Sequence, residues 1–295
     1  MAFKSLQLFF LLLASFTSHV ISRHIPTPIP QHLYGCRKGD NVEGIHSIKK
    51  YLHRYGYLSH NTNTSSHIEL NSNTFDDTLE SAVKLYQKWS KLNVSGILDQ
   101  QTLDQIFKPR CGLPDVIMKS NSNKNTEDDL EISSHYALFP GNQKWPDYKR
   151  HLTYTFTNNF PIDFVPSVTE AMKEWAAHSL FTFSQAADDQ VPDINISFQV
   201  GDHGDGVPFD GPGGVVGHAF APTDGRLHLD GDDKWSAGLE TQKVNVMNAA
   251  LHELGHVLGL AHSTVQQAVM WPYIDVYALK ALTDDDIAGL TALYP

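Results

Sequence analysis

The 295-residue chain contains only two cysteines, Cys36 and Cys111. They allow at most one intramolecular disulfide, between these two positions. A buried structural thiol prefers apolar neighbours, whereas Cys111 lies in KPRCGLPD (108–115), among prolines, a glycine and charged side chains. This composition predicts a turn outside the core, so packing does not explain why a cysteine stands there.

Long apolar runs are also scarce. The first residues carry Lys4 ahead of an apolar run from Leu6 to Phe16, followed by small and polar residues. The run is too short to span a bilayer and is typical of a secretory signal peptide, assigned here to 1–22. We therefore expect a secreted, extracellular protein without a membrane anchor, in the apoplast or cell wall if the source is a plant.

Basic side chains are few in the second half of the chain. Residues 136–295 contain 8 basic and 20 acidic side chains, whereas residues 23–135 contain 13 of each. Such a negative half is a poor nucleic-acid binder. Its excess of carboxylates indicates either solubility alone or bound cations.

The first half has the pattern of a small helical domain. Apolar residues recur at helical spacing over 42–58 and 75–89, and a third short helix fits 100–107. Three short helices predict a bundle. The polar stretch 119–134 predicts an exposed linker, open to proteolytic cleavage. We assign 23–135 to one N-terminal region comprising the bundle, the cysteine loop and the linker.

Strands and helices alternate in the second half, which predicts one compact mixed domain over 136–295. The expected strands cover 151–156 and 193–200, and the expected helices cover 164–180, 244–260 and 282–294. Thr283 suits the N-cap of the last helix. The chain as a whole is predicted to be α+β.

The stretch HELGHVLGLAH (252–262) is the most informative. On a helix, His252 and His256 share one face and can bind one metal ion, with Glu253 beside them to accept a proton from a water molecule. Gly259 can end the helix so that His262 becomes a third ligand. Three protein ligands and an open position are typical of catalytic zinc. The alternative is a solvated helix face with histidines paired to acids.

A glycine-rich stretch over 203–235 carries further candidate ligands. Four side chains suit a closed tetrahedral zinc site, namely His203, Asp205, His218 and His228. Asp210, with the flexible backbone of FDGPGG, supplies oxygen ligands for a hard cation, and Asp230 and Asp233 are within reach. The alternative is a hydrated acidic loop without ions.

The HExxHxxGxxH motif, followed by Met270 in AVMWPY, resembles the metzincin zinc peptidases and their methionine turn. The chain is most similar to the matrix metalloproteinases, or matrixins, in the short form without a hemopexin domain that is typical of plants. The propeptide signature of that family, PRCGxPD, stands complete at 109–115, and the resemblance therefore implies that 23–135 is a propeptide.

The resemblance implies a helical prodomain similar to peptidoglycan-binding domains and a catalytic domain with a mixed twisted sheet and three helices. It implies two zinc ions, Met270 beneath the catalytic one, and an Arg110–Asp115 pair that holds the cysteine loop. It further implies calcium, at Asp210, Gly211, Gly213, Val215, Asp230 and Asp233.

The chain departs from the family pattern in three places. Asp233 replaces the usual glutamate, and Arg226 occupies a position where many matrixins carry a calcium-binding aspartate. A second calcium site that uses Asp193 is therefore doubtful. Tyr273 directly follows the proline after Met270, one residue earlier than usual, so the wall of the specificity pocket is expected to be atypical.

A catalytic zinc would give Cys111 a purpose, because a thiolate can occupy the open coordination position. Cleavage in the linker would then release the propeptide and activate the enzyme. The competing interpretation is a Cys36–Cys111 disulfide. Sequence alone does not exclude it.

The sequence thus predicts a secreted zinc endopeptidase, made as a zymogen and monomeric. Its partners would be protein or peptide substrates and an activating protease. The rival functions are a metzincin of another subfamily and a non-catalytic wall-binding protein. Glycans are expected at Asn63 and Asn93, which lie in Asn-x-Ser/Thr motifs.

Overall fold

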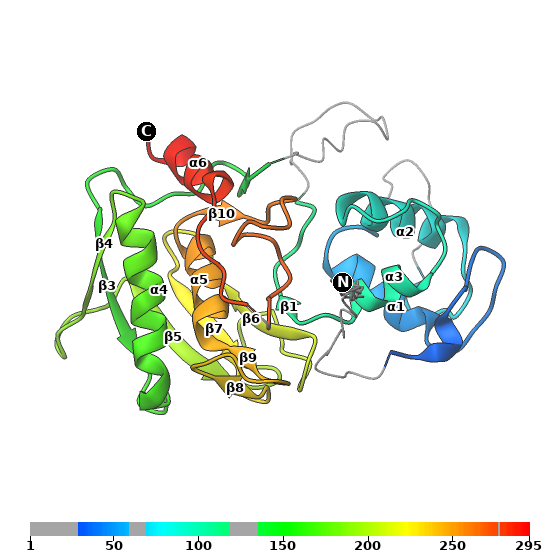
Figure 1. Cartoon of the computed structure of the whole chain (residues 1–295), viewed down its shortest axis with the longest axis horizontal. Helices are drawn as coiled ribbons and strands as arrows, with labels where there is room; N and C mark the ends of the chain where they lie inside the picture. Colours follow the sequence, from blue (N-terminus) through cyan, green and yellow to red (C-terminus); the bar gives the residue numbers. More distant parts are fainter. Residues whose placement is uncertain (1–28, 59–68, 118–134, 277) are drawn as a thin grey trace, which may run out of the picture.

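The computed structural model describes residues 29–58, 69–117, 135–276 and 278–295. The predicted signal peptide, the linker 119–134 and Asn63 lie outside the described residues. In Figure 1, helices α1, α2 and α3 of the N-terminal part lie beside a larger part that contains the sheet and helices α4, α5 and α6, and β1 lies between the two parts. Among the described residues, no helix is long and apolar enough to cross a membrane.

The N-terminal helices confirm the predicted bundle, with shorter bounds. They are α1 (Ile45–Arg54), α2 (Asp77–Trp89) and α3 (Gln100–Ile106), preceded by a 3₁₀ turn at Gln31–Leu33. Asp76 caps α2 by accepting a hydrogen bond from the Leu79 N–H at 2.8 Å, and Asp99 caps α3 in the same way. Buried Lys49 of α1 pairs with Asp76, which ties α1 to the start of α2.

One mixed sheet of six strands organises the larger part, in the order β1-β6-β7-β5-β3-β4. Its strands are β1 (Arg110–Cys111), β3 (His151–Phe156), β4 (Thr182–Gln185), β5 (Ile194–Gln199), β6 (Val215–Ala219) and β7 (Arg226–Asp230). All neighbouring pairs are parallel except β6 and β7. The sheet therefore takes its first edge strand from the N-terminal half of the chain.

Two short strand pairs complete the larger part. They are β10 (Leu260–Ala261) with β2 (Ala137–Leu138), and β8 (Trp235–Ser236) with β9 (Val244–Asn245). The first pair joins the start of the C-terminal half to the segment that directly follows α5.

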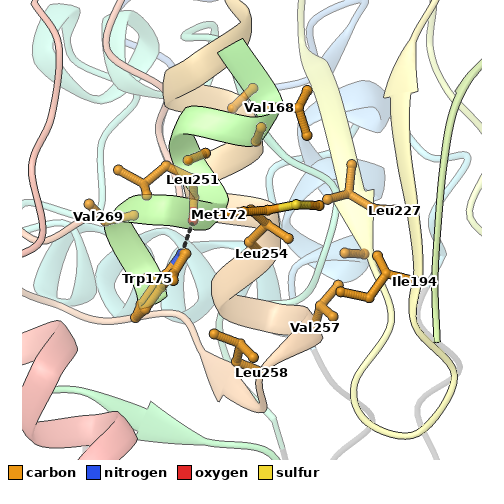
Figure 2. Close-up of a cluster of buried hydrophobic side chains, with 14 of the residues drawn as sticks. Val168, Met172, Trp175, Ile194, Leu227, Leu251, Leu254, Val257, Leu258 and Val269 are labelled. Atoms are coloured by element: carbon orange, nitrogen blue, oxygen red, sulfur yellow. Dashed lines mark hydrogen bonds between the residues drawn. The ribbon is translucent and has the colours of Figure 1, made fainter. Parts of the chain in front are cut away.

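The three predicted helices of this part are present. They are α4 (Val165–Ala177, after a 3₁₀ turn at Ile162–Phe164), α5 (Val246–Val257) and α6 (Asp284–Leu293). Figure 2 shows Met172 and Trp175 of α4 packed beside Leu251 and Leu254 of α5. The Trp175 indole N–H donates to the Leu251 carbonyl at 2.8 Å. This packing holds α5 against the sheet, which shares the same buried cluster.

The prediction of a turn outside the core around Cys111 was wrong. Arg110 and Cys111 form strand β1, and their exposed fractions are 1 % and 0 %. The Arg110 and Gly112 N–H groups each donate at 2.8 Å to carbonyls of the β6 segment, those of Gly214 and Gly217. Local composition favours a turn, but the edge of β6 offers partners for these backbone groups.

Candidate metal centres and active site

Helix α5 and the turn after it bring three histidines together. His252 and His256 lie one turn apart on α5, with Nε2 atoms 3.1 Å apart. Gly259 has φ of 105°, a conformation that favours glycine, and reverses the chain toward His262. An added Cβ at Gly259 would lie 2.6 Å from the Gln143 carbonyl oxygen, so packing also requires glycine there.

Hydrogen bonds orient each imidazole ring. Nδ1 of His252 donates to the Val269 carbonyl and Nδ1 of His256 to the Leu260 carbonyl, both at 2.7 Å. Nδ1 of His262 lies 2.7 Å from a carboxylate oxygen of Asp115. Donation from Nδ1 leaves Nε2 as the free ligand atom, which is the arrangement of metal-binding histidines.

Cys111, from the N-terminal half of the chain, completes this cluster. Its Sγ lies 3.4 Å from Nε2 of His256, and the four ligand atoms of Cys111, His252, His256 and His262 all lie within 4.8 Å of one another. All four residues are buried, and Nε2 of His262 has no hydrogen-bond partner among the residues that the structure describes. Burial lowers the pKa of His252 and His256 well below its ordinary value. Neutral imidazoles, a thiol and an orphaned buried nitrogen fit zinc.

Glu253 lies next to the cluster and is fully buried. Its Oε2 is 3.6 Å from Sγ of Cys111, and its Oε1 has no hydrogen-bond partner in the described part of the chain. Burial raises the pKa of this carboxyl to about 8. Gly217 of β6 makes room for it, because an added Cβ would lie 3.3 Å from Oε1. The side chain is therefore held beside the position that the sulfur occupies.

Met270 packs against α5 at Gly255. A Cβ added to Gly255 would lie 2.2 Å from the Met270 sulfur, so this contact requires glycine. Asp286 holds this turn: its carboxylate accepts hydrogen bonds from the Met270 and Val269 N–H groups, both at 3.0 Å. It also accepts from the N–H and hydroxyl of Thr283, both at 2.8 Å, in a capping box. Sequence reasoning took Thr283 as the N-cap but missed Asp286, whose position three residues later was the available signal.

A second cluster lies at strands β6 and β7. His218 and His228 face each other in the antiparallel register, and Asp205 lies between them and His203. One Asp205 oxygen is 2.8 Å from His203 Nε2, 2.7 Å from His218 Nε2 and 2.9 Å from His228 Nδ1. Burial lowers the pKa of His218 to about 4. The predicted four side chains thus converge as a tetrahedral zinc site requires.

Two segments near this cluster, 210–215 and 230–233, bring three carboxylates together. Asp233 accepts from the Gly213 N–H at 2.7 Å, and Asp210 accepts from the Val215 N–H at 3.0 Å. One oxygen each of Asp230 and Asp233 is buried and has no hydrogen-bond partner within 29–58, 69–117, 135–276 and 278–295. Burial raises the pKa of Asp230 to about 6 and that of Asp233 to about 7. Orphaned carboxylate oxygens at this place fit a calcium ion.

Asp193 has a different environment. One of its oxygens pairs with Lys149 Nζ at 2.5 Å, and the other accepts from the N–H and hydroxyl of Thr153 at 2.8 and 3.0 Å. The Arg226 guanidinium donates two hydrogen bonds to Asp224, at 2.7 and 2.8 Å. Both carboxylate oxygens of Asp193 and the Arg226 guanidinium thus have partners within the protein.

The predicted pair Arg110–Asp115 is present, at 2.6 Å and almost wholly buried. The Arg110 guanidinium also lies over the rings of Tyr55 and Tyr273, 3.3 and 5.0 Å from their centroids.

Cys36 and Cys111 are both free thiols, and Cys36 is buried near the His32 carbonyl. Asn93 is exposed.

Comparisons with known proteins match both halves of the chain. A family model described as Matrixin matches residues 144–295, and one described as a putative peptidoglycan binding domain matches residues 41–106. The chain is 40 % identical to Metalloendoproteinase 2-MMP of Arabidopsis thaliana over 88 % of its own length and 73 % of the relative's. It is 40 % identical to Metalloendoproteinase 1 of Glycine max, with 87 % and 83 % covered. Mouse stromelysin-1 is 35 % identical, with 86 % and 50 % covered.

Proposed function

Because the chain belongs to the matrixin family and is a zinc metalloendopeptidase, we propose that it is a secreted, latent zymogen that hydrolyses extracellular proteins. His252, His256 and His262 would hold the catalytic zinc, and Cys111 would be the fourth ligand in the proform. When bound, zinc supplies a Lewis acid that activates water and polarises the peptide carbonyl. The observation that carries this proposal is the convergence of these four ligand atoms beside Glu253.

Glu253 would act as general base and then as general acid. It would take a proton from the attacking water and pass it to the leaving amine. Its burial beside the histidine cluster supports this role, because the side chain is fixed next to the position of the candidate metal. Its proximity to Sγ of Cys111 supports a water position where the sulfur now lies.

Latency would come from strand β1, which occupies the edge of the sheet beside the metal centre. The Cys111 N–H donates to the Pro272 carbonyl at 2.8 Å, and the Ile274 N–H donates to the Pro109 carbonyl at 3.0 Å. On its other side β1 pairs with β6. An extended substrate would need the same backbone groups, so the propeptide excludes it.

The remaining ions would be structural. His203, Asp205, His218 and His228 would hold a second zinc, and Asp210, Asp230 and Asp233 a single calcium with carbonyls of Gly211, Gly213 and Val215. We further propose that the enzyme acts as a monomer and that another protease cuts within 119–134.

Activation of the purified proform tests this function. A thiol-reactive mercurial should release activity on casein and on a peptide library, and the library would also define the substrate class. Glu253→Gln should remain inactive while it retains zinc. Zinc-loaded protein that cleaves no peptide after the propeptide has been removed would refute the proposal.

A further inference from the structure

Two aromatic residues that follow the methionine turn lie under the N-terminal helices. Trp89 of α2 stacks on Trp271, with ring centroids 5.1 Å apart and planes at 18°. The Tyr273 hydroxyl is 2.7 Å from that of Tyr86 and 3.0 Å from that of Tyr51. Propeptide side chains thus bind both a ring face and a hydroxyl of the catalytic half.

These residues belong to a shared core. Phe209, Val215, Trp271 and Tyr273 lie in the same buried cluster as the apolar side chains of α1, α2 and α3. Trp271 is 6 % exposed and Tyr273 is 4 % exposed. The catalytic half therefore completes the core of the helical domain, as in protein interfaces with a desolvated aromatic centre.

Further contacts of the helical domain avoid the metal centre. The Arg54 guanidinium donates to the Pro208 carbonyl at 3.1 Å, and the Gln266 amide donates to the Ser90 carbonyl at 3.3 Å. Neither these contacts nor the aromatic ones use the Cys111 thiol or the linker 119–134. They can persist when either is lost.

We propose that Trp271 and Tyr273 form a docking site for the helical N-terminal domain that works without the Cys111 thiolate and without the covalent linker. The proposal rests on the zymogen function proposed above. It adds that the cut propeptide stays bound as a separate chain, so activation requires dissociation as well as cleavage. The docking site would thus make activation depend on protein concentration.

The test uses the full chain with Glu253→Gln, which prevents self-digestion, and a recognition sequence for a specific protease within 119–134. After cleavage, size-exclusion chromatography and tryptophan fluorescence measure binding of the propeptide. We expect the fragments to co-elute at micromolar concentration, with Cys111 intact or as Cys111→Ser. In the Cys111→Ser background, Tyr86→Phe should raise Kd about tenfold, and Trp89→Leu about thirtyfold.

Tyr34→Phe is the matched control, because Tyr34 belongs to the same domain but is 59 % exposed. Thermal unfolding of each uncut chain shows whether the variant folds. If Trp89→Leu does not fold, Tyr86→Phe still tests the proposal, because it removes only a hydroxyl and keeps the ring. Immediate separation of the cut Cys111→Ser propeptide, or equal Kd in all variants, would overturn the proposal. Because binding is measured in an inactive background, an inactive parent enzyme would refute only the proposed function.

Discussion

Asp115 of the propeptide lies 2.7 Å from Nδ1 of His262, although 147 residues separate the two. The same carboxylate pairs with Arg110 at 2.6 Å and accepts a hydrogen bond from the Tyr57 hydroxyl at 2.6 Å. The cysteine loop therefore contacts the histidine cluster twice, through the sulfur of Cys111 and through Asp115. This second contact links the shape of the loop to the orientation of a candidate zinc ligand.

Asp115→Ala should destabilise the proform and weaken its latency. It leaves Arg110 as an unpaired buried cation, and breaking a buried pair costs about 3–5 kcal/mol. We expect a lower Tm of the proform and faster activation by mercurial. Glu170→Ala is the control, since the exposed Lys173–Glu170 pair should contribute little. Equal Tm and activation rate in both variants would contradict the role given to Asp115.

Cys111→Ser should make the proform active on small peptides without mercurial, because a neutral hydroxyl is a much poorer zinc ligand than a thiolate. Its activity should stay below that of the mature enzyme, since docking at Trp271 and Tyr273 persists. Mass spectrometry of the non-reduced proform provides the second measurement. A linked Cys36–Cys111 peptide would exclude the thiolate switch, and Cys36→Ser serves as the control.

Glu253→Gln should lower the turnover of the mature enzyme by about two to four orders of magnitude, because the amide cannot accept the proton. Zinc content and fold should be unchanged. His256→Ala should instead lose the catalytic zinc, which metal analysis of the purified protein would detect. Near-native turnover of Glu253→Gln would rule out its role as the base.

Calcium removal should lower the Tm of the mature domain, because Asp230 and Asp233 then repel each other in a buried site. Metal analysis should give one calcium and two zinc ions per chain, since Lys149 and Arg226 occupy the region of the second calcium. Asp233→Asn should reduce the effect of chelation, whereas exposed Asp202→Asn should not. Two calcium ions per chain would show that Asp193 does bind one.

Asp286→Ala should weaken zinc binding at a distance. Asp286 holds the N–H of Val269, whose carbonyl orients the His252 ring. Loss of such supporting partners lowers metal affinity about 10–100-fold. Dialysis against a chelator measures the zinc affinity of the variant. Asp284→Ala, at an exposed position on the same helix, is the control. Identical zinc loss from both variants would leave Asp286 with only its capping role.

The sequence by itself determined the helices, the mixed second half and the composition of both ligand clusters. The reason is that these features are local: apolar spacing sets the helices, and His252 and His256 share a face because four residues make about one turn. His218 and His228 also stand in one short stretch, which limits their separation.

Only the tertiary structure decided which segments far apart in the sequence contact each other. It turned the expected loop at Arg110–Cys111 into an edge strand, because β6 offered backbone partners for the N–H groups of Arg110 and Gly112. It likewise brought Trp89 onto Trp271. Contacts of this kind depend on how two completed surfaces fit, which no local pattern of residues encodes.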